Sequence, residues 1–449
     1  MKNQTLISKG GASVEITEAM MDSLLAEALS KIQSEQANAG PVLILPPDIT
    51  RYYSRAGFLT DVAVRELGSR VRSVMPALGT HMAMTDEELA RMFPKTPRAL
   101  FCNHDWRNDV VELGRLEAQW VEKITDGKVK YDWPVQVNKA LVDSGLSLIV
   151  SIGQVVPHEV VGMANHTKNL FVGTGGKEAI DKSHFVGASY GMEKMMGRAD
   201  TPVRRLFDEG FERFGSKLPP VLFVLTVIGP RKAADETSGS GSSGGGSPST
   251  VVRGLFIGFG KECFDKAAAL AREVNVDILD KPIQKAVVYL EPEEFRTTWL
   301  GNKAVYRTRM AMADNGELLI LAPGLERFGE DLEVDRLIRK FGYRPSSVIL
   351  EKTKTEKEIA DNLSVAAHLI HGSSEGRFTI RYCPGPKVSR SEIESVGYEW
   401  GSLDEAMTHY DISKLTMGWN NHADGESFFY VPNPALGLWS EKSRFESAG

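Results

Sequence analysis

Short apolar runs alternate with segments of helical periodicity along the first half of the chain, and this alternation constrains the fold more than any other feature. The runs are PVLIL at 41–45, RSVMPAL at 72–78, ALFC at 99–102 and SLIVSIG at 147–153, with helices expected near 57–70 and 85–93. Strands that alternate with helices are typical of a parallel sheet covered by helices. We therefore expect an N-terminal α/β domain over residues 1–275.

A second series of strand-like and helical segments follows Lys285. The expected strands are AVVYL, ELLILA, SVILE and FTIRYC, and the expected helices include DLEVDRLIRKFG and TEKEIADNLSVAAHLI. A chain of 449 residues is long enough for two such cores. We predict a smaller C-terminal α/β domain over 285–430, a tail over 431–449, mainly parallel sheets in both domains, and an active site in the crevice between them.

A Ser/Gly-rich tract interrupts the first domain. The sequence DETSGSGSSGGGSP lies between VLFVLTVIG and STVVRGLFIGFG, two runs rich in β-branched and aromatic residues. Such a tract cannot order itself by burying side chains, so it is either a domain linker or a loop. Because strand-like runs border it on both sides, we predict a hairpin whose loop covers about 236–249.

Charge and composition exclude several classes of partner. The formal net charge is -6 and the isoelectric point is near 5.9, which gives no broad attraction to nucleic acid or to an anionic membrane. No secretory signal and no continuous apolar stretch of about 18 residues is present, so we expect a cytoplasmic protein that does not cross a membrane. Cys102, Cys263 and Cys383 are far apart and lack a CxxC spacing, which indicates buried thiols rather than disulfides or a zinc site.

Polar residues gather directly after three of the apolar runs. In an open parallel sheet ligands bind at the carboxyl ends of the strands, so these positions are candidate site residues. They are Asp48, Thr50 and Arg51 in PPDITR, His81 in GTHMAMTDEE, and His158, His166 and Lys168 in QVVPHEVVGMANHTKN. Taken singly, each residue is as well explained by a helix cap, a hydrogen-bonded loop histidine or a surface cation. Their convergence on one sheet edge makes that edge the expected active site.

The residue types narrow the reaction class. Two histidines suit paired proton transfer near neutral pH, and an arginine beside them suits bidentate capture of a carboxylate. The expected substrate is a small anion with an exchangeable proton. No GxSxG, HExxH, Walker or GxGxxG motif appears in the context that each requires, and GTGGKEA at 173–179 is expected to be a loop that leads into a helix.

The order and spacing of these residues resemble the lactate racemases that use a nickel pincer nucleotide. That family has a DxTR element, a Gly-x-His loop before an acidic helix start, and a Pro-His element followed by lysine and a further histidine. The matching positions are Asp48-Ile49-Thr50-Arg51, Gly79-Thr80-His81, Pro157-His158, Lys168 and His184. The resemblance covers most of the chain.

The resemblance implies a role for each matching residue. It implies that His81 and His158 are the two acid/bases and that Arg51 and Lys303 hold the substrate carboxylate. Asp48 and Thr50 would help to hold the cofactor nucleotide, Lys168 would attach it covalently, and His184 would ligate nickel. The implied activity is racemisation or epimerisation at C2 of a small 2-hydroxy acid, with cofactor-biosynthesis proteins as partners.

Two departures from the family pattern leave alternatives open. Asn165-His166-Thr167 replaces a glycine-glycine-basic run before Lys168, so the cofactor is bound either covalently or non-covalently, and His166 competes with His184 as the nickel ligand. Met82 replaces an arginine after His81, which indicates a substrate other than lactate. Two other functions remain: a metal-dependent hydrolase or lyase with His81, His104 and His158 as ligands, and a cofactor-binding protein without turnover.

Overall fold

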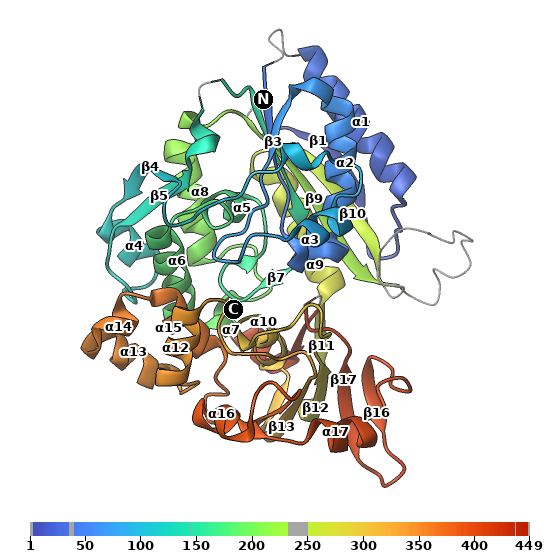
Figure 1. Ribbon diagram of the computed structural model, residues 1–449, viewed down its shortest axis with the longest axis vertical. Coiled ribbons are helices and arrows are strands. Elements are labelled where there is room, and N and C mark those ends of the chain that lie inside the picture. The colour runs from blue at the N-terminus through green and yellow to red at the C-terminus, as the bar shows by residue number, and fades with distance from the viewer. Residues whose placement is uncertain (1–2, 36–39, 144, 232–249, 436, 448–449) are drawn as a thin grey trace. The chain divides into compact units, whose positions relative to one another are not determined.

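The computed structural model describes residues 3–35, 40–143, 145–231, 250–435 and 437–447 (Figure 1). The chain forms two compact α/β units. Unit 1 contains residues 1–183 and 197–275, and unit 2 contains residues 184–196 and 276–449. The chain therefore passes from one unit to the other three times, and helix α6 (Lys177–Tyr190) contributes residues to both.

The main sheet of unit 1 has six strands in the order β1-β10-β9-β6-β2-β3. Strands β9, β6, β2 and β3 run parallel, β10 pairs antiparallel with β9, and β1 pairs antiparallel with β10 at the edge. Their bounds are β1 (Thr5–Gly10), β2 (Val42–Leu45), β3 (Val71–Val74), β6 (Leu148–Gln154), β9 (Val221–Pro230) and β10 (Thr250–Phe259).

The central strands of this sheet are apolar because both of their faces are covered. Every residue of β2 and β6 is buried, as expected for a parallel sheet between helical layers. Helices α1 (Glu18–Glu35) and α2 (Ala56–Leu67) share one hydrophobic core with Val150 and Ile152, and α9 (Lys261–Asn275) packs on β9 and β10. The sheet thus fixes the carboxyl ends of β2 and β6, from which the candidate site residues extend.

Shorter elements complete unit 1. The 3-10 helices are η1 (Ile49–Ser54), η2 (Gly68–Arg70), η3 (Arg98–Leu100), η4 (Lys139–Val142) and η5 (Gly215–Lys217). The α-helices are α3 (Asp86–Met92), α4 (Ala118–Ile124), α5 (Thr167–Phe171) and α8 (Pro202–Phe214). Two antiparallel pairs are β4 (Val110–Leu116) with β5 (Trp133–Asn138), and β7 (Pro157–His158) with β8 (Gly162–Met163).

Unit 2 is built on a six-stranded sheet in the order β15-β14-β13-β12-β17-β16, in which only β16 is antiparallel to its neighbour. The strands are β12 (Ile283–Tyr289), β13 (Met312–Ala322), β14 (Thr379–Pro384), β15 (Glu399–Trp400), β16 (Gly418–Asn421) and β17 (Ser427–Val431). A parallel pair, β11 (Val276–Leu279) with β18 (Leu438–Glu441), lies apart from that sheet.

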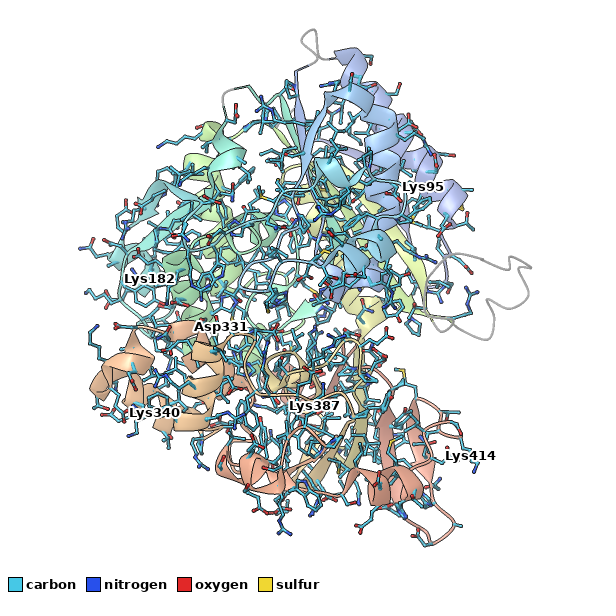
Figure 2. All side chains as sticks on the ribbon, viewed as in Figure 1. Lys95, Lys182, Asp331, Lys340, Lys387 and Lys414 are labelled. Carbon is cyan, nitrogen blue, oxygen red and sulfur yellow. The ribbon has the colours of Figure 1, made fainter. Side chains whose placement is uncertain are left out.

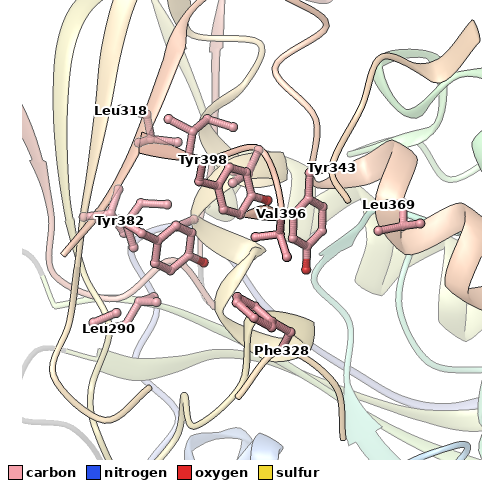
Figure 3. Close-up of a cluster of buried hydrophobic side chains, with 14 of the residues drawn as sticks. Leu290, Leu318, Phe328, Tyr343, Leu369, Tyr382, Val396 and Tyr398 are labelled. Atoms are coloured by element: carbon pink, nitrogen blue, oxygen red, sulfur yellow. The ribbon is translucent and has the colours of Figure 1, made fainter. Parts of the chain in front are cut away.

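Helices and aromatic side chains form the core of unit 2. Three buried tyrosines stack in series, Tyr343 on Tyr398 with ring centroids 4.5 Å apart and Tyr398 on Tyr382 at 5.1 Å (Figure 3). The helices are α7 (Met192–Met195), α10 (Thr298–Gly301), α11 (Lys303–Thr308), α12 (Leu332–Phe341), α13 (Ser346–Thr355), α14 (Lys357–Ala360), α15 (Leu363–His371), α16 (Arg390–Ser395), α17 (Leu403–His409) and α18 (Lys442–Ser447).

The mixed α/β class with mainly parallel sheets is confirmed, and three local predictions are wrong. SVILE forms helix α13 rather than a strand, ALFC forms η3 and a single bridge from Phe101 to Val74, and RSVMPAL is extended only to Val74. A short apolar run does not distinguish a strand from a helix by periodicity, and in α13 only Ile349 is fully buried.

Strands β9 and β10, which border the Ser/Gly-rich tract, pair antiparallel, and the predicted loop at 236–249 lies outside the described residues. The chain passes into unit 2 for residues 184–196, and residues from the expected tail at 431–449 form β18 and α18 within unit 2.

Charged side chains cover the outside of both units, among them Lys182 in α6 and Lys340 in α12 (Figure 2). Lys182 pairs with Glu178, and Lys340 pairs with Glu358. None of the helices in the described ranges has the length and apolar character needed to span a bilayer.

Candidate active site

Asp48 follows β2 and begins η1. Its side chain caps η1 by accepting the backbone N–H of Thr50 at 3.2 Å, and it also accepts the Thr50 hydroxyl at 2.6 Å. Burial raises the pKa of Asp48, but the charge and hydrogen bond of His81, the Thr50 hydroxyl and the Arg51 charge outweigh it and leave the pKa below 3.8. Asp48 is therefore an ionised carboxylate at neutral pH.

His81 lies on the loop that follows β3 and contacts this carboxylate. Its Nδ1 atom is 2.6 Å from Oδ2 of Asp48. Because an ionised carboxylate can only accept, Nδ1–H is the donor, and in the neutral imidazole the lone pair is on Nε2. The loop is held in place by the turn bond from His81 N–H to Leu78 and by the bond from Gly79 N–H to Gly173. Asp48 thus orients the His81 ring and leaves the lone pair of the neutral imidazole on Nε2.

In His158 the Nδ1 atom accepts a hydrogen bond, whereas in His81 it donates one. His158 is buried in the short strand β7, and its Nδ1 accepts the backbone N–H of Val160 at 3.1 Å. The neutral ring therefore carries its proton on Nε2. Oε2 of Glu159 lies 3.7 Å from the same Nδ1, close enough to stabilise the ring when it is doubly protonated. Neutral His81 and neutral His158 are thus fixed in different tautomers.

Lys168 is half-buried in helix α5, and its electrostatic neighbours are the other candidate residues. Burial, followed by the positive charge of Arg51, lowers the pKa of Lys168 to about 8, while Glu159 and Asp48 act in the opposite direction. A substantial fraction of the amine is therefore neutral near pH 8 and able to act as a nucleophile. The structure brings Asp48, Arg51, Lys168 and the His158–Glu159 pair together at one end of the unit 1 sheet.

The two residues before Thr167 have strained backbones. Asn165 has φ 68°, and His166 has φ 59° with ψ -130°, a region in which glycine is the usual residue. Their conformation is held by a 2.7 Å bond from His166 N–H to the Asn165 side chain and by close packing of Asn165 against Gly153, where a Cβ would lie 2.0 Å from the Asn165 amide nitrogen. The strain at Asn165 and His166 is therefore offset by contacts with the surrounding structure.

His166 is a core histidine. Its ring lies between Phe223 and Phe264, with centroid distances of 4.0 and 5.1 Å, and its Nε2 lies 3.0 Å from the carbonyl oxygen of Gly260. Since that carbonyl can only accept, Nε2 donates the hydrogen bond. Burial, together with the Arg204 charge, lowers the pKa of His166 well below 6.5. The His166 ring is therefore enclosed in the core, with its Nε2 atom engaged by the Gly260 carbonyl.

His104 and the glycine-rich segment 173–177 form hydrogen bonds within unit 1. Nε2 of His104 donates to the carbonyl of Gly175 at 3.0 Å, and Nδ1 accepts the Asn138 amide at 2.9 Å, so both ring nitrogens have partners. In the segment 173–177 the backbone N–H groups of Gly173, Thr174, Gly175 and Lys177 bond to backbone carbonyls. The segment leads into α6, as expected, and does not present those N–H groups to a phosphate.

The two remaining candidates belong to unit 2. His184 lies in the part of α6 assigned to that unit, and its charge contributes, after burial and Arg309, to lowering the pKa of the neighbouring His371 to about 3. Lys303 is the first residue of α11 and is buried, with its ammonium group 5.3 Å from the centroid of Phe295.

Three residues of unit 1 were missed by the sequence reasoning. Glu159 beside His158 and Arg204 beside Thr167 carry no motif, and Gln154 ends β6 as an ordinary polar residue after an apolar run. Gln154 is buried, and within the described part of the chain its amide nitrogen has no hydrogen-bond partner. Its position at a strand end was the one available signal.

Comparisons with known proteins agree with this architecture. A crystal structure of a protein from Thermotoga maritima is 23% identical, with a TM-score of 0.78 over 97% of this chain and 100% of that one. The lactate racemase apoprotein from Thermoanaerobacterium thermosaccharolyticum is 14% identical, with a TM-score of 0.68 over 97% of this chain and 94% of that one.

At these identities the two structures show a common fold. No curated protein matches the sequence. Residues 2–195, which include Asp48, Arg51, His81, His158, Lys168 and His184, match the lactate racemase N-terminal domain. The N-terminal part of the chain is therefore similar to the lactate racemase N-terminal domain, and the whole chain shares its fold with a lactate racemase apoprotein.

Proposed function

We propose that the protein is a racemase or epimerase that inverts C2 of a small 2-hydroxy acid with a nickel pincer nucleotide as cofactor. The observation that carries this proposal is the 2.6 Å contact between His81 and the ionised Asp48, beside a lysine whose pKa is lowered to about 8. An oriented base, a reactive amine and an arginine at one sheet edge are the groups that such a reaction requires.

The residues present suit the proposed cofactor. Lys168 would hold the nucleotide through an amide or thioamide bond, because its partly neutral amine is able to attack an activated carboxyl or thiocarboxyl carbon, from which the activating group leaves while the amine loses a proton. His184 would supply the protein ligand to nickel. When bound, the nucleotide supplies a hydride acceptor and donor, a capacity that no amino-acid side chain has.

His81 removes the hydroxyl proton of one enantiomer. Its Nε2 lone pair accepts that proton, and the resulting imidazolium is stabilised by the charge of Asp48 through Nδ1–H. Loss of the hydroxyl proton together with the C2 hydride leaves a planar 2-keto acid, which is open to return of hydride on either face.

His158 serves the other face of the planar intermediate. In its neutral form Nε2–H donates a hydrogen bond to the keto oxygen, and in its doubly protonated form, which Glu159 stabilises, it gives up a proton to that oxygen. Arg51 would bind the substrate carboxylate throughout, with Lys303 as a second cation for the same group. Asp48 and Thr50 act in this proposal by orienting His81 rather than by holding the nucleotide.

The geometry gives less support to the two alternatives. A hydrolase or lyase with His81, His104 and His158 as metal ligands would require His104 to give up one of two hydrogen bonds, and no group of three or more His, Cys, Asp or Glu in the described ranges is arranged to hold a metal ion. A cofactor carrier without turnover would not need the oriented Asp48–His81 pair.

Racemisation by the loaded enzyme tests the proposal directly. The chain is co-expressed with pincer-biosynthesis proteins, and both enantiomers of a panel of 2-hydroxy acids, including sugar acids, are followed by chiral chromatography. We expect interconversion in at least one pair, with the C2 hydrogen largely retained in heavy water. Loaded enzyme that interconverts no pair, or that incorporates solvent deuterium at C2 in the first turnovers, contradicts the proposal.

Intact mass tests the covalent bond. An added cofactor mass is expected in the wild-type protein and in Lys177→Ala, a matched control because Lys177 pairs with Asp181 in α6. The added mass is expected to be absent from Lys168→Ala. Added mass that Lys168→Ala retains under denaturing conditions would place the covalent bond at another residue, and cofactor that is seen only under native conditions would leave non-covalent binding as the mode of attachment.

A further inference from the structure

Arg204 makes a cluster of contacts directly before Lys168. It lies in α8 with only 1% of its surface exposed, and its guanidinium group donates to three acceptors on the segment 163–167. Nη2 donates to the carbonyls of Met163 at 2.6 Å and Asn165 at 3.1 Å, and Nη1 donates to the Thr167 hydroxyl at 2.8 Å. The acceptors lie on both sides of the strained Asn165–His166 pair.

Other contacts fix the guanidinium group itself. Its central carbon lies 4.2 Å from the centroid of Phe264, one of the two rings that enclose His166. Asp208 accepts the Thr167 hydroxyl at 2.8 Å and lies 3.9 Å from Nη1 of Arg204. The arginine, the aromatic ring and the carboxylate therefore form one packed unit that holds the turn.

Lys168 follows this turn and is fixed on its other side as well. The next residue, Asn169, donates its amide to the Ser151 hydroxyl at 2.9 Å and to the Leu45 carbonyl at 3.3 Å, which ties α5 to β6 and β2. The carbonyl of Lys168 accepts the N–H groups of Val172 and Gly173. The backbone of Lys168 is thus held between the Arg204 contacts and the sheet.

We propose that Arg204 is a positioning residue for Lys168. By binding both ends of the Asn165–His166 turn, it holds a strained backbone that keeps the lysine half-buried beside Arg51, Asp48 and Glu159. Strained, non-glycine backbone persists only where surrounding contacts determine it, and Arg204 supplies three of them. The value of this arrangement for catalysis rests on the proposed role of Lys168 in binding the cofactor, whereas the positioning itself is measurable in the apoprotein.

The test is the pH profile of Lys168 modification in the apoprotein. Trinitrobenzenesulfonate, which reacts with neutral amines, is applied at a series of pH values, and the modified peptide is quantified by mass spectrometry, with Lys168→Ala identifying the peptide. We expect a midpoint near pH 8 in the wild-type protein, where burial and Arg51 lower the pKa.

Arg204→Met removes the donors and keeps an unbranched apolar chain. Loosening the turn lets water reach Lys168 and also removes a positive neighbour, so the midpoint should rise by about one pH unit or more, and modification at pH 7.5 should slow roughly 5- to 10-fold. Arg204→Lys keeps the charge without the forked donors and should also raise the midpoint, which separates the contacts from the charge. Arg205→Met, an exposed neighbour in α8 that pairs with Asp200, should leave the midpoint unchanged.

Folding of each variant is checked by circular dichroism. If Arg204→Met does not fold, Thr167→Val, which removes one acceptor of Arg204, carries the same expected upward shift. A folded Arg204 variant with the wild-type midpoint, or an equal shift in Arg205→Met, would overturn the inference. Because this measurement needs neither cofactor nor turnover, a shifted midpoint in a protein that lacks racemase activity would support the positioning role and count against the proposed function alone.

Discussion

Val160 donates its backbone N–H to Nδ1 of His158 at 3.1 Å. The corresponding atom of His81 instead donates to Asp48 at 2.6 Å, so the two neutral imidazoles differ in which nitrogen carries the proton. His81 is ready to accept a proton at Nε2. His158 must change tautomer before it can accept a proton there, and it must become doubly protonated before it can act as an imidazolium acid. The two proposed acid/bases are therefore not equivalent in the resting protein.

This asymmetry predicts the behaviour of single variants in half-reactions. His81→Ala and His158→Ala should each lower steady-state racemisation in both directions by about 10²–10⁴-fold, because turnover crosses both half-reactions. Mixed in excess over one enantiomer, each loaded variant should still form 2-keto acid from the enantiomer served by its remaining histidine. Rapid-quench analysis should give opposite preferences for the two variants, with the faster wild-type half-reaction being the one lost in His81→Ala.

Equal failure of both variants with both enantiomers, while cofactor and substrate still bind, would contradict the assignment of two facing acid/bases. One histidine would then have to be reassigned to substrate positioning.

Replacement of Asp48 by asparagine should impair catalysis through His81. The amide cannot stabilise the imidazolium by charge and allows the wrong tautomer, so we expect kcat to fall by about 10²-fold or more with a smaller change in KM. The control is Asp61→Asn in α2, a buried carboxylate that accepts the Thr96 hydroxyl and is expected to affect stability rather than kcat. A wild-type kcat in Asp48→Asn would show that the pair does not orient the base.

The lowered pKa of Lys168 predicts a pH-dependent stability difference. Its pKa is about 8 in the folded protein and 10.5 as the reference value, so between these values the unfolded state binds more protons, and the folded protein gains stability as pH rises. Lys168→Met removes the cost of burying the charge and should raise the free energy of unfolding at pH 7 by about 1–3 kcal/mol. Urea denaturation from pH 7 to 10 should show that this gain shrinks above pH 8; a pH-independent difference would contradict the shift.

Gln154→Leu should be tolerated or stabilising. The amide nitrogen of Gln154 is buried, with no hydrogen-bond partner among the described residues, and replacing an unsatisfied donor with an apolar side chain should change the free energy of unfolding by about 0 to +2 kcal/mol. Asn169→Leu is the matched control, since it breaks two hydrogen bonds and should cost about 1–3 kcal/mol. An equal loss of the free energy of unfolding in both variants would mean that the Gln154 amide has a hydrogen-bond partner in solution.

Long, strongly patterned elements could be predicted from the sequence, and the short ones could not. Parallel β6 and β2 and the hairpin β9–β10 follow from continuous apolar runs. SVILE has the composition of a strand, yet it lies in the ten-residue helix α13, which follows Pro345. Only Ile349 of this helix is buried, so the segment packs through one apolar face, as a surface helix does. Such tertiary context is not encoded within five residues.

In the candidate site, the positions of several residues could be predicted from the sequence, whereas their hydrogen-bond partners could not. Strand ends identified Asp48, Arg51, His81 and Lys168, which the structure brings to one edge. Hydrogen-bond partners determine chemistry but leave no local pattern: nothing in the sequence showed that Asp48 faces His81, that His104 has both nitrogens engaged, or that Arg204, some 36 residues after Lys168, binds the turn before it.

Because the chain leaves unit 1 after residue 183 and returns at residue 197, neither unit is a contiguous stretch of sequence. Met192 and Met196 pack in a small core with Tyr306, Met310 and Leu438, all of unit 2. A fragment ending at residue 275 would retain the two methionines but lack the residues that cover them, and a fragment beginning at residue 276 would have an unfilled gap in the same core. Evolutionary exchange of the C-terminal half for another domain, or its loss by proteolysis, therefore carries a solubility cost that a simple tandem arrangement of domains would avoid.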